Sequence, residues 1–108
     1  MRQTRKQMYE KAIELWGADN QVNQAIEELQ ELGIALNKFR RNSSYAECRD
    51  SYNSYRGNVL EEIADVRQMI GQLILIFDFK DPELQEMSDI VLRKLQREMD
   101  HEREKRRG

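Results

Sequence analysis

Apolar residues recur every three or four positions along most of this chain, and this spacing is the feature that most constrains its fold. Such a period places apolar side chains on one face of an α-helix, and no alternating pattern of useful length favours a β-strand. Only five glycines and one proline interrupt the chain. The sequence therefore predicts an all-α fold, a helical bundle of four main helices at about residues 4–16, 19–41, 58–79 and 81–99.

Residues that start and stop helices stand at the expected ends of these segments. Thr4 is expected to cap the first helix and Gly17 to end it. Asp81 is expected to cap the fourth helix, with Pro82 in its first turn and Glu83 close to the positive end of the helix dipole. The third segment is the most apolar, so we place it at the centre of the bundle.

The chain is short and polar, which limits the core that one copy can build. It has 108 residues, of which 39% are hydrophobic and 35% are charged. We interpret residues 1–100 as a single domain with a thin core, followed by a charged tail, residues 101–108, that frays into solvent. Burial of the apolar stripes against further copies would complete this core, so we expect a homodimer or homotetramer.

Simple counts disfavour several classes of function and location. The net charge of −2 gives no general attraction to nucleic acid, and we expect no stable nucleic-acid partner. The longest apolar run, 73–77, is too short to span a bilayer, and residues 1–10 lack the apolar stretch of a signal peptide. The single cysteine, Cys48, excludes an internal disulfide and a cysteine-based zinc site, and the single histidine, His101, lies in the charged tail. These features favour a cytoplasmic protein without a membrane partner, whose main catalytic option is a metal held by oxygen ligands.

Two similar acidic segments, EELQEL and EEIADV, lie on the second and third predicted helices. Residues three apart share a helix face, so Glu28 pairs with Glu31 and Glu62 pairs with Asp65. Both pairs fall at the border of an apolar stripe and not on the solvated face. If the two helices pack antiparallel through their stripes, the two acidic pairs can meet.

The mutual repulsion of these four acids requires a cation nearby. None of them is followed by a Lys or Arg three or four residues later. Each pair of like charges costs roughly 0.2–0.5 kcal/mol even on an exposed helix. Ligation by carboxylates alone favours Mg²⁺, or Mn²⁺, over Zn²⁺. A solvated acidic face is the usual interpretation of one such pair, but two matching pairs at the stripe edges favour a metal site.

These motifs resemble the signature of the MazG-like family of all-α nucleoside triphosphate pyrophosphohydrolases, in its single-domain phage and bacterial form. That signature is an ExxE helix followed by an ExxD helix, matched here by Glu28-Leu-Gln-Glu31 and Glu62-Ile-Ala-Asp65. Weaker matches are Trp16-Gly17 before the first motif and Lys94-Leu-Gln-Arg97 in the last helix. The resemblance covers residues 13–97, and the long polar connection between the motifs departs from the family's pattern.

The resemblance implies an enzyme that cleaves a (d)NTP between its α- and β-phosphates, giving a nucleoside monophosphate and pyrophosphate. It implies that the bound metal lowers the pKa of a water molecule. Glu31 is our candidate for the catalytic base, and Glu27 and Glu61 are candidates for supporting the ligands or holding an outer ion. The metal ligands would be the four acids of the two motifs: Glu28, Glu31, Glu62 and Asp65.

Basic side chains are candidates for contacts to the triphosphate. Lys38 lies on the same side of its helix as Glu31, about 10 Å further along at 1.5 Å per residue. Lys94 and Arg97 stand three apart on the last predicted helix and could clamp phosphate oxygens together. The alternative for all three is a solvated helix face.

Other side chains are candidates for contacts to the base. Trp16 could stack on it or pack against the bundle, and Gln21 and Gln24 could read its edges. The polar connection at residues 40–57 could form a lid over the nucleotide or remain a polar loop. The residues that would carry such a lid are Tyr45, Arg49, Tyr52, Tyr55 and Arg56.

The sequence is also compatible with two other functions. A non-catalytic adaptor protein would oligomerise through its apolar stripes, but it would be expected to pair its acids with Lys or Arg at a spacing of four residues. A small nucleic-acid-associated protein would use the arginine-rich connection and the terminal EREKRRG sequence, which the net charge of −2 disfavours.

Overall fold

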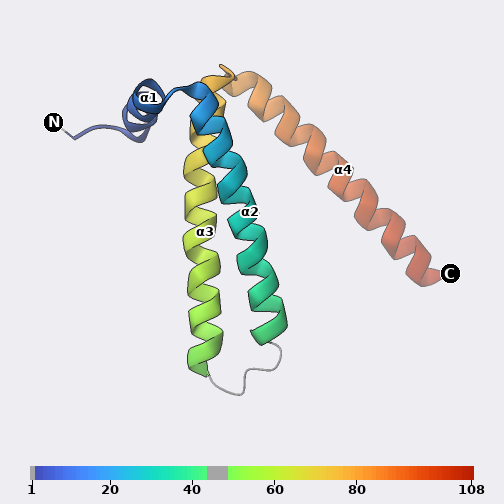
Figure 1. Ribbon diagram of the computed structural model, residues 1–108. Helices are drawn as coiled ribbons and strands as arrows, with labels where there is room; N and C mark the ends of the chain where they lie inside the picture. Colours follow the sequence, from blue (N-terminus) through green and yellow to red (C-terminus); the bar gives the residue numbers. More distant parts are fainter. Residues whose placement is uncertain (1, 44–48) are drawn as a thin grey trace. The chain divides into compact units, whose positions relative to one another are not determined.

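The computed structural model describes residues 2–43 and 49–108, and these parts of the chain are almost entirely helical. The helices are α1 (Arg5–Trp16), α2 (Ala18–Ser43), α3 (Arg49–Ile76) and α4 (Asp81–Arg107) (Figure 1). The described residues include no β-strand. The predicted all-α fold with four main helices is therefore confirmed.

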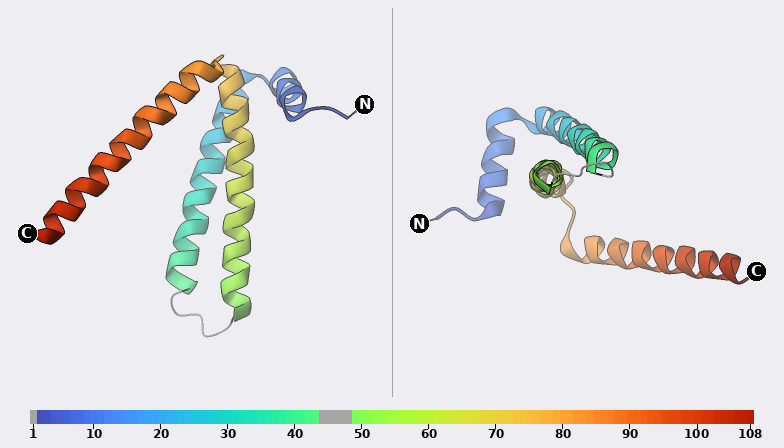
Figure 2. Two further views of the ribbon diagram at one scale, coloured as in Figure 1. Left: turned by 180° about the vertical axis from the view of Figure 1, so that it is seen from behind. Right: turned by 90° about the horizontal axis from the view of Figure 1, so that it is seen from below.

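The helices form two compact units, one that ends at Phe77 and contains α1 to α3, and one that begins at Asp78 and contains α4. Within the first unit, α2 packs along α3 and α1 contacts both of them. Figure 2 shows α2 and α3 side by side, with α1 close to the end where α2 begins and α3 finishes. The described apolar core of this unit is small and consists of Ala25, Ala35, Val66 and Met69.

Small side chains explain how closely α2 and α3 can approach each other. Ala25 and Ala35 of α2 retain only 3% and 2% of their exposure, although alanine is too short to reach far from its helix. Val66 and Met69 of α3 supply the larger buried side chains. These four buried residues lie along the stretches of α2 and α3 that carry the two acidic motifs.

The predicted ends of α1 are confirmed by its capping contacts. The Oγ1 atom of Thr4 accepts a hydrogen bond from the Gln7 backbone N–H at 3.1 Å, and the Gln7 Oε1 atom accepts one from the Thr4 N–H at 2.9 Å. This reciprocal arrangement is a capping box. Gly17 ends the helix with a φ of +86°, a conformation that favours glycine, and its N–H donates to the Ile13 carbonyl at 2.8 Å.

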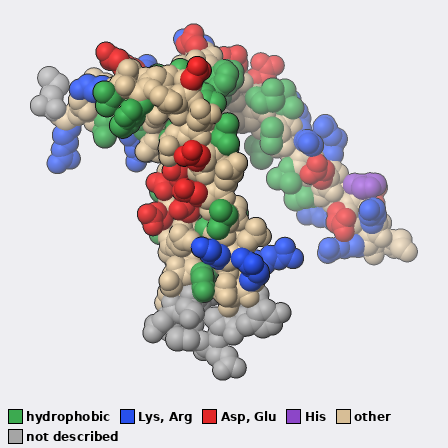
Figure 3. Space-filling view, viewed as in Figure 1, with side chains coloured by type: hydrophobic (Ala, Val, Ile, Leu, Met, Phe, Trp, Pro, Cys, Tyr) green, Lys and Arg blue, Asp and Glu red, His purple; other side chains and the backbone are tan. Residues whose placement is uncertain are grey.

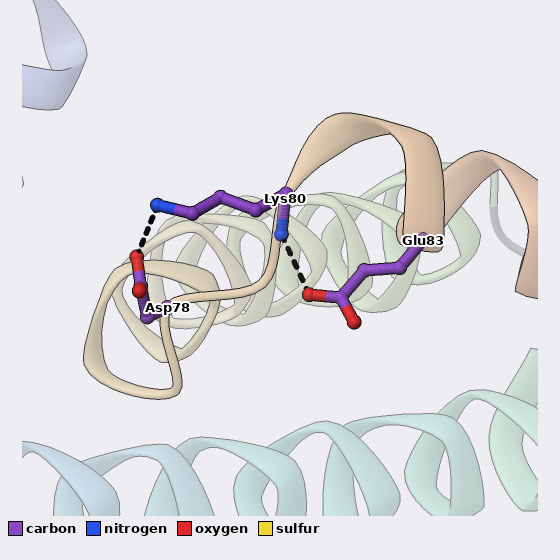
Figure 4. Close-up of polar contacts among 3 residues, drawn as sticks. All are labelled: Asp78, Lys80 and Glu83. Carbon is purple, nitrogen blue, oxygen red and sulfur yellow. Dashed lines mark hydrogen bonds and ion pairs between the residues drawn. The ribbon is translucent and has the colours of Figure 1, made fainter.

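The start of α4 corrects the prediction that Asp81 caps this helix. Lys80 occupies the cap position, and its backbone N–H donates to Glu83 Oε1 at 2.8 Å (Figure 4). The Lys80 ammonium also lies 2.6 Å from Asp78 Oδ1. Because Glu83 already reaches back to the cap, Asp81 is free to enter the first turn, where its charge faces the positive end of the dipole. Pro82 lies in the first turn, as predicted.

Two helices extend further than the apolar pattern indicated. Helix α3 begins at Arg49, not near residue 58, so part of the polar connection is helical. Helix α4 continues to Arg107, so the tail at 101–108 does not fray as predicted. An ion pair between Arg106 and Glu102 at 3.3 Å and a basic last turn support this end of α4.

The second unit consists of α4 alone, so by itself it cannot bury the apolar side of this helix. None of its residues is buried within the described structure. Its large apolar side chains remain between 39% and 63% exposed at Met87, Ile90, Val91, Leu92, Leu95 and Met99. No helix among the described residues combines the length and apolar content needed to cross a membrane.

Candidate metal centre

Three carboxylates from α2 and α3 meet at one side of the first unit. Glu28 projects from α2, and Glu62 and Asp65 project from α3. Each offers an oxygen, and these oxygens all lie within 4.8 Å of one another. All three residues are half-buried. Figure 3 shows acidic side chains gathered partway along the α2–α3 pair. We call Glu28, Glu62 and Asp65 the carboxylate cluster.

The helix faces explain why these residues converge. Glu62 and Asp65 are separated by three positions and therefore share one face of α3. Their neighbour Val66 is buried, which places that face at the border of the α2 contact. Glu28 lies three positions after the buried Ala25 on α2, so it also stands at the border of this contact. The contact between α2 and α3 thus carries both acidic motifs to one place.

Two carboxylate oxygens in the cluster lack hydrogen-bond partners although they are buried. They are Oε2 of Glu28 and Oε2 of Glu62. The other oxygen of Glu28 accepts a hydrogen bond from Gln24 Nε2 at 3.0 Å. Leaving a buried polar atom unpaired costs roughly 1–3 kcal/mol, and more for a charged group. A bound cation would remove this cost for both oxygens at once.

No basic side chain among the described residues forms an ion pair with the cluster. The described ion pairs involve other acids, Asp78, Asp100 and Glu102. The cluster therefore lacks a basic partner both at helical spacing in the sequence and among the described ion pairs. An all-oxygen donor set with surplus negative charge fits a hard divalent cation.

The electrostatics of the cluster disfavour its charged form when it holds no metal. Burial raises the pKa of Glu28 above its ordinary value, and the charges of Glu31 and Asp65 raise it further, while the Gln24 hydrogen bond opposes the shift. Burial also raises the pKa of Glu62, as do the neighbouring charges, of which that of Glu31 is the largest. Both carboxyls therefore hold protons more tightly than isolated glutamates do.

Glu31, the fourth predicted ligand, lies beside the cluster and is exposed. Its oxygens are outside the group that meets within 4.8 Å, but its charge acts on both Glu28 and Glu62. Glu27 and Glu61 are also exposed, and Glu61 adds to the raised pKa of Glu62. The structure thus groups three of the predicted ligands and places Glu31 next to them.

A cavity of about 890 Å³ opens beside the cluster. Glu28 and Asp65 form part of its wall, so a molecule in the cavity can reach cluster oxygens. Two of the predicted substrate-binding residues, Trp16 and Gln24, also line it, and so does Glu27. Trp16 is 57% exposed, so much of its ring surface is available to contact a bound molecule.

The cavity lies in the first unit, and Lys38, the predicted basic residue of that unit, does not line it. Lys38 is exposed on α2, nearly three turns after the cluster residue Glu28. Lys94 and Arg97 are exposed on α4, in the second unit. Within the polar connection, Arg56 is exposed on α3 and Tyr55 is half-buried. Tyr45 and Cys48 lie outside the described residues, as do the side chains of Arg49 and Tyr52.

The most buried polar residue of the cavity wall, Gln72, is not among the residues predicted from the sequence. Only 3% of Gln72 is exposed, and its Oε1 accepts a hydrogen bond from Gln21 Nε2 at 2.7 Å. One sequence signal could have found it, because Gln72 lies three positions after Met69, on the buried side of α3. Tyr9, a half-buried residue of α1 whose ring lies against Gly71 of α3, was also not predicted from the sequence.

Comparison of this chain with protein-family models, with curated proteins and with solved structures finds no match.

Proposed function

We propose that this chain is a Mg²⁺-dependent nucleotide pyrophosphohydrolase of the MazG-like type, which hydrolyses a (d)NTP to a (d)NMP and pyrophosphate in the cytoplasm. One observation carries the proposal: the carboxylate cluster, with two unpaired buried oxygens, adjoins a cavity of about 890 Å³. Small-molecule sites usually have volumes of about 300–1,000 Å³. The cavity is thus large enough for a nucleotide whose phosphates face the acids.

The residues of the cluster would have one shared role. Glu28, Glu62 and Asp65 would hold Mg²⁺, or Mn²⁺, through their carboxylate oxygens. The bound ion supplies positive charge to the triphosphate and lowers the pKa of a coordinated water. The hydrogen bond from Gln24 to Glu28 would leave the second Glu28 oxygen directed to the ion.

Glu31 is the proposed general base. It lies beside the cluster and is more exposed than the three ligands, so it can accept a proton without leaving a ligand position. Water then forms a bond to the α-phosphorus, the bond from that phosphorus to the bridging oxygen breaks, and pyrophosphate leaves. Glu27 and Glu61 would orient the ligands or hold a further ion.

The remaining predicted residues would bind the substrate. Trp16 and Gln24 line the cavity and are proposed to contact the base. Lys38, Lys94 and Arg97 are proposed to contact phosphate oxygens. The uncovered apolar side of α4 supports the proposal that the chain forms a homodimer or homotetramer.

The uncovered side of α4 also favours a second candidate function, a non-catalytic helical adaptor. Such a protein would use α4 to join copies or partners, and its cavity would have no chemical role. The unpaired oxygens of the cluster disfavour this alternative, because buried acids without basic neighbours would destabilise an adaptor and give it no function in return.

Pyrophosphate release distinguishes the two candidates. The protein is incubated with Mg²⁺ and each canonical (d)NTP, and pyrophosphate and orthophosphate are quantified separately. We expect pyrophosphate and the nucleoside monophosphate in equal amounts, and a loss of at least about 100-fold in rate for Glu62→Gln. Glu86→Gln, which removes an exposed acid on α4, is the matched control and should retain the rate. Orthophosphate as the only product, or no turnover of any nucleotide, would contradict the proposal.

A further inference from the structure

The cavity has a polar wall built from glutamine side chains of α2 and α3. Gln21 and Gln72 are 6% and 3% exposed, which is unusual for an uncharged amide in so small a core. Gln68, one turn before Gln72, also lines the cavity and is exposed. An amide buried without partners destabilises the fold, so the position of these groups requires a hydrogen-bonding explanation.

The three amides satisfy one another in a chain. Gln21 Nε2 donates to Gln72 Oε1 at 2.7 Å, and Gln72 Nε2 donates to Gln68 Oε1 at 2.8 Å. Gln72 therefore uses both its oxygen and its nitrogen inside the chain, whereas each end residue uses one group there and turns its other group to the surroundings. We call Gln21, Gln72 and Gln68 the amide relay.

The relay can run in either direction. A carboxamide has an oxygen and a nitrogen of nearly equal size, and rotating it by half a turn exchanges acceptor and donor. If all three amides rotate together, Gln68 donates to Gln72 and Gln72 donates to Gln21, so the same number of bonds remains. The groups offered at the two ends are exchanged: an end that presented an oxygen now presents an N–H.

The relay lies at a defined distance from the carboxylate cluster. Gln21 precedes Glu28 by seven residues on α2, and Gln72 follows Asp65 by seven residues on α3. At 1.5 Å per residue, both helices place the relay about 10 Å from the cluster along their axes. All four residues line the same cavity. A ligand that holds phosphate at the cluster therefore extends its other end to the relay.

Apolar side chains of α1 complete this end of the cavity. Met8 and Trp16 line it and are 56% and 57% exposed, which leaves flat apolar surface available to a ring. Aromatic rings and bases stack well because each has a flat π-face. This end of the cavity thus offers a stacking surface and a hydrogen-bonding edge, which together suit a planar heterocycle.

We infer that the relay end of the cavity binds the nucleotide base, and that the amide relay reverses its direction to accept either an amino or a keto edge. This inference rests on the proposed function for the identity of the ligand. It makes Gln21, Gln72 and Gln68 specificity-determining residues. Because these residues accept either edge, we expect the enzyme to discriminate weakly between two bases that differ only in whether a position donates or accepts a hydrogen bond.

The test compares dCTP with dUTP, whose bases differ in this exchange at one edge. For the natural chain, we expect values of kcat/KM for the two substrates that agree within about threefold. Gln72→Glu fixes the relay, because a carboxylate only accepts and both end amides must then donate to it. Their oxygens would then face the ligand, so dCTP should be favoured over dUTP by at least about tenfold.

Two controls separate this effect from general damage. Gln85→Glu adds the same charge on exposed α4 and should leave the dCTP to dUTP ratio unchanged. Gln72→Met breaks the relay without adding charge and should lower kcat/KM for both substrates by similar factors. Circular dichroism checks the fold of each variant, and if Gln72→Glu does not fold, the ratio in the natural chain decides alone. A preference above about tenfold in the natural chain, or an unchanged ratio in a folded Gln72→Glu, would overturn the inference.

A binding measurement distinguishes this inference from the proposed function. Both dCMP and dUMP are titrated into ¹⁵N-labelled protein, and the side-chain amide signals of Gln21 and Gln72 are followed. We expect both signals to shift with either nucleotide. Shifts without pyrophosphate release from any triphosphate would contradict the proposed reaction and leave base binding standing. Pyrophosphate release without these shifts would overturn the relay and leave the reaction standing.

Discussion

Glu28 of α2 and Glu62 of α3 each hold a buried Oε2 atom that has no hydrogen-bond partner, and the two residues belong to one cluster with Asp65. Two such oxygens at one helix contact are costly in an empty site and useful in one that binds a cation. This relationship links the packing of α2 on α3 to the proposed chemistry.

The raised pKa values of Glu28 and Glu62 predict an unusual dependence of stability on pH without metal. The folded chain binds protons more tightly than the unfolded chain at these two carboxyls, so ionising them destabilises the fold. Stability should therefore rise as pH falls from the raised pKa values to the ordinary value of 4.5. Urea unfolding in EDTA at pH 7.5 and at pH 4.5 measures this difference.

The control for this experiment is a variant that removes the two carboxyls whose pKa values are raised by their acidic neighbours. Glu31, Asp65 and Glu61 all raise the pKa of Glu62 through their charges, and no described basic residue opposes them. Replacing Glu28 and Glu62 together by glutamine should flatten the pH dependence and raise stability at pH 7.5. A natural chain whose stability does not rise from pH 7.5 to pH 4.5 relative to that of the double variant would contradict the electrostatic description.

A second prediction concerns the packing of α1. A methyl group built on Gly71 would overlap the Tyr9 ring, with Cδ2 at 3.0 Å and Cζ at 3.2 Å. Gly71→Ala should therefore displace Tyr9 and destabilise the fold by about 1–3 kcal/mol, despite the better helix propensity of alanine. Gly33→Ala is the control, because nothing lies within 4 Å of its added Cβ, and it should stabilise by about 0.5–1 kcal/mol. Equal effects of the two changes in urea unfolding would show that Gly71 is not a packing site.

The apolar side of α4 predicts self-association. Sedimentation equilibrium should give a dimer or a larger assembly, and Leu95→Asp should weaken it by introducing a charge into the stripe. The change should raise the dissociation constant by at least about tenfold, which corresponds to about 1.4 kcal/mol. Glu86→Gln, nine residues before Leu95 and therefore on the opposite side of α4, is the control and should leave the assembly intact. A natural chain that sediments as a monomer at all concentrations would contradict this prediction.

Local signals in the sequence account for much of the fold. Thr4, Gly17 and Pro82 act within one turn of a helix, so their roles follow from neighbouring residues alone. The meeting of Glu28 with Glu62 and Asp65 was also predictable, because two apolar stripes that pack together bring their borders together. The spacing of residues on each helix was therefore enough to predict this contact between the two helices.

Other features depend on contacts that a hydropathy pattern does not record. The first turns of α3 contain few apolar residues, so the helix from Arg49 to residue 57 has no periodic signal. The cap at Lys80 depends on Glu83 reaching back to it, which competes with the equally plausible cap at Asp81. Gln72 is counted as polar in any pattern, and its burial requires Gln21 on another helix. Whether α4 is covered by further copies depends on residues beyond a single chain.

The most direct test of the central claim is the effect of Mg²⁺ on the melting temperature. Metal that binds only the folded chain stabilises it by about 2.7 kcal/mol at a concentration 100 times its Kd, and each kcal/mol is about 4–8 °C for a small domain. We predict that millimolar Mg²⁺ raises the melting temperature of the natural chain and of Glu86→Gln by several degrees, and that Glu62→Gln loses this gain. An identical melting temperature with and without Mg²⁺, or an equal gain in Glu62→Gln, would contradict a metal centre at Glu28, Glu62 and Asp65.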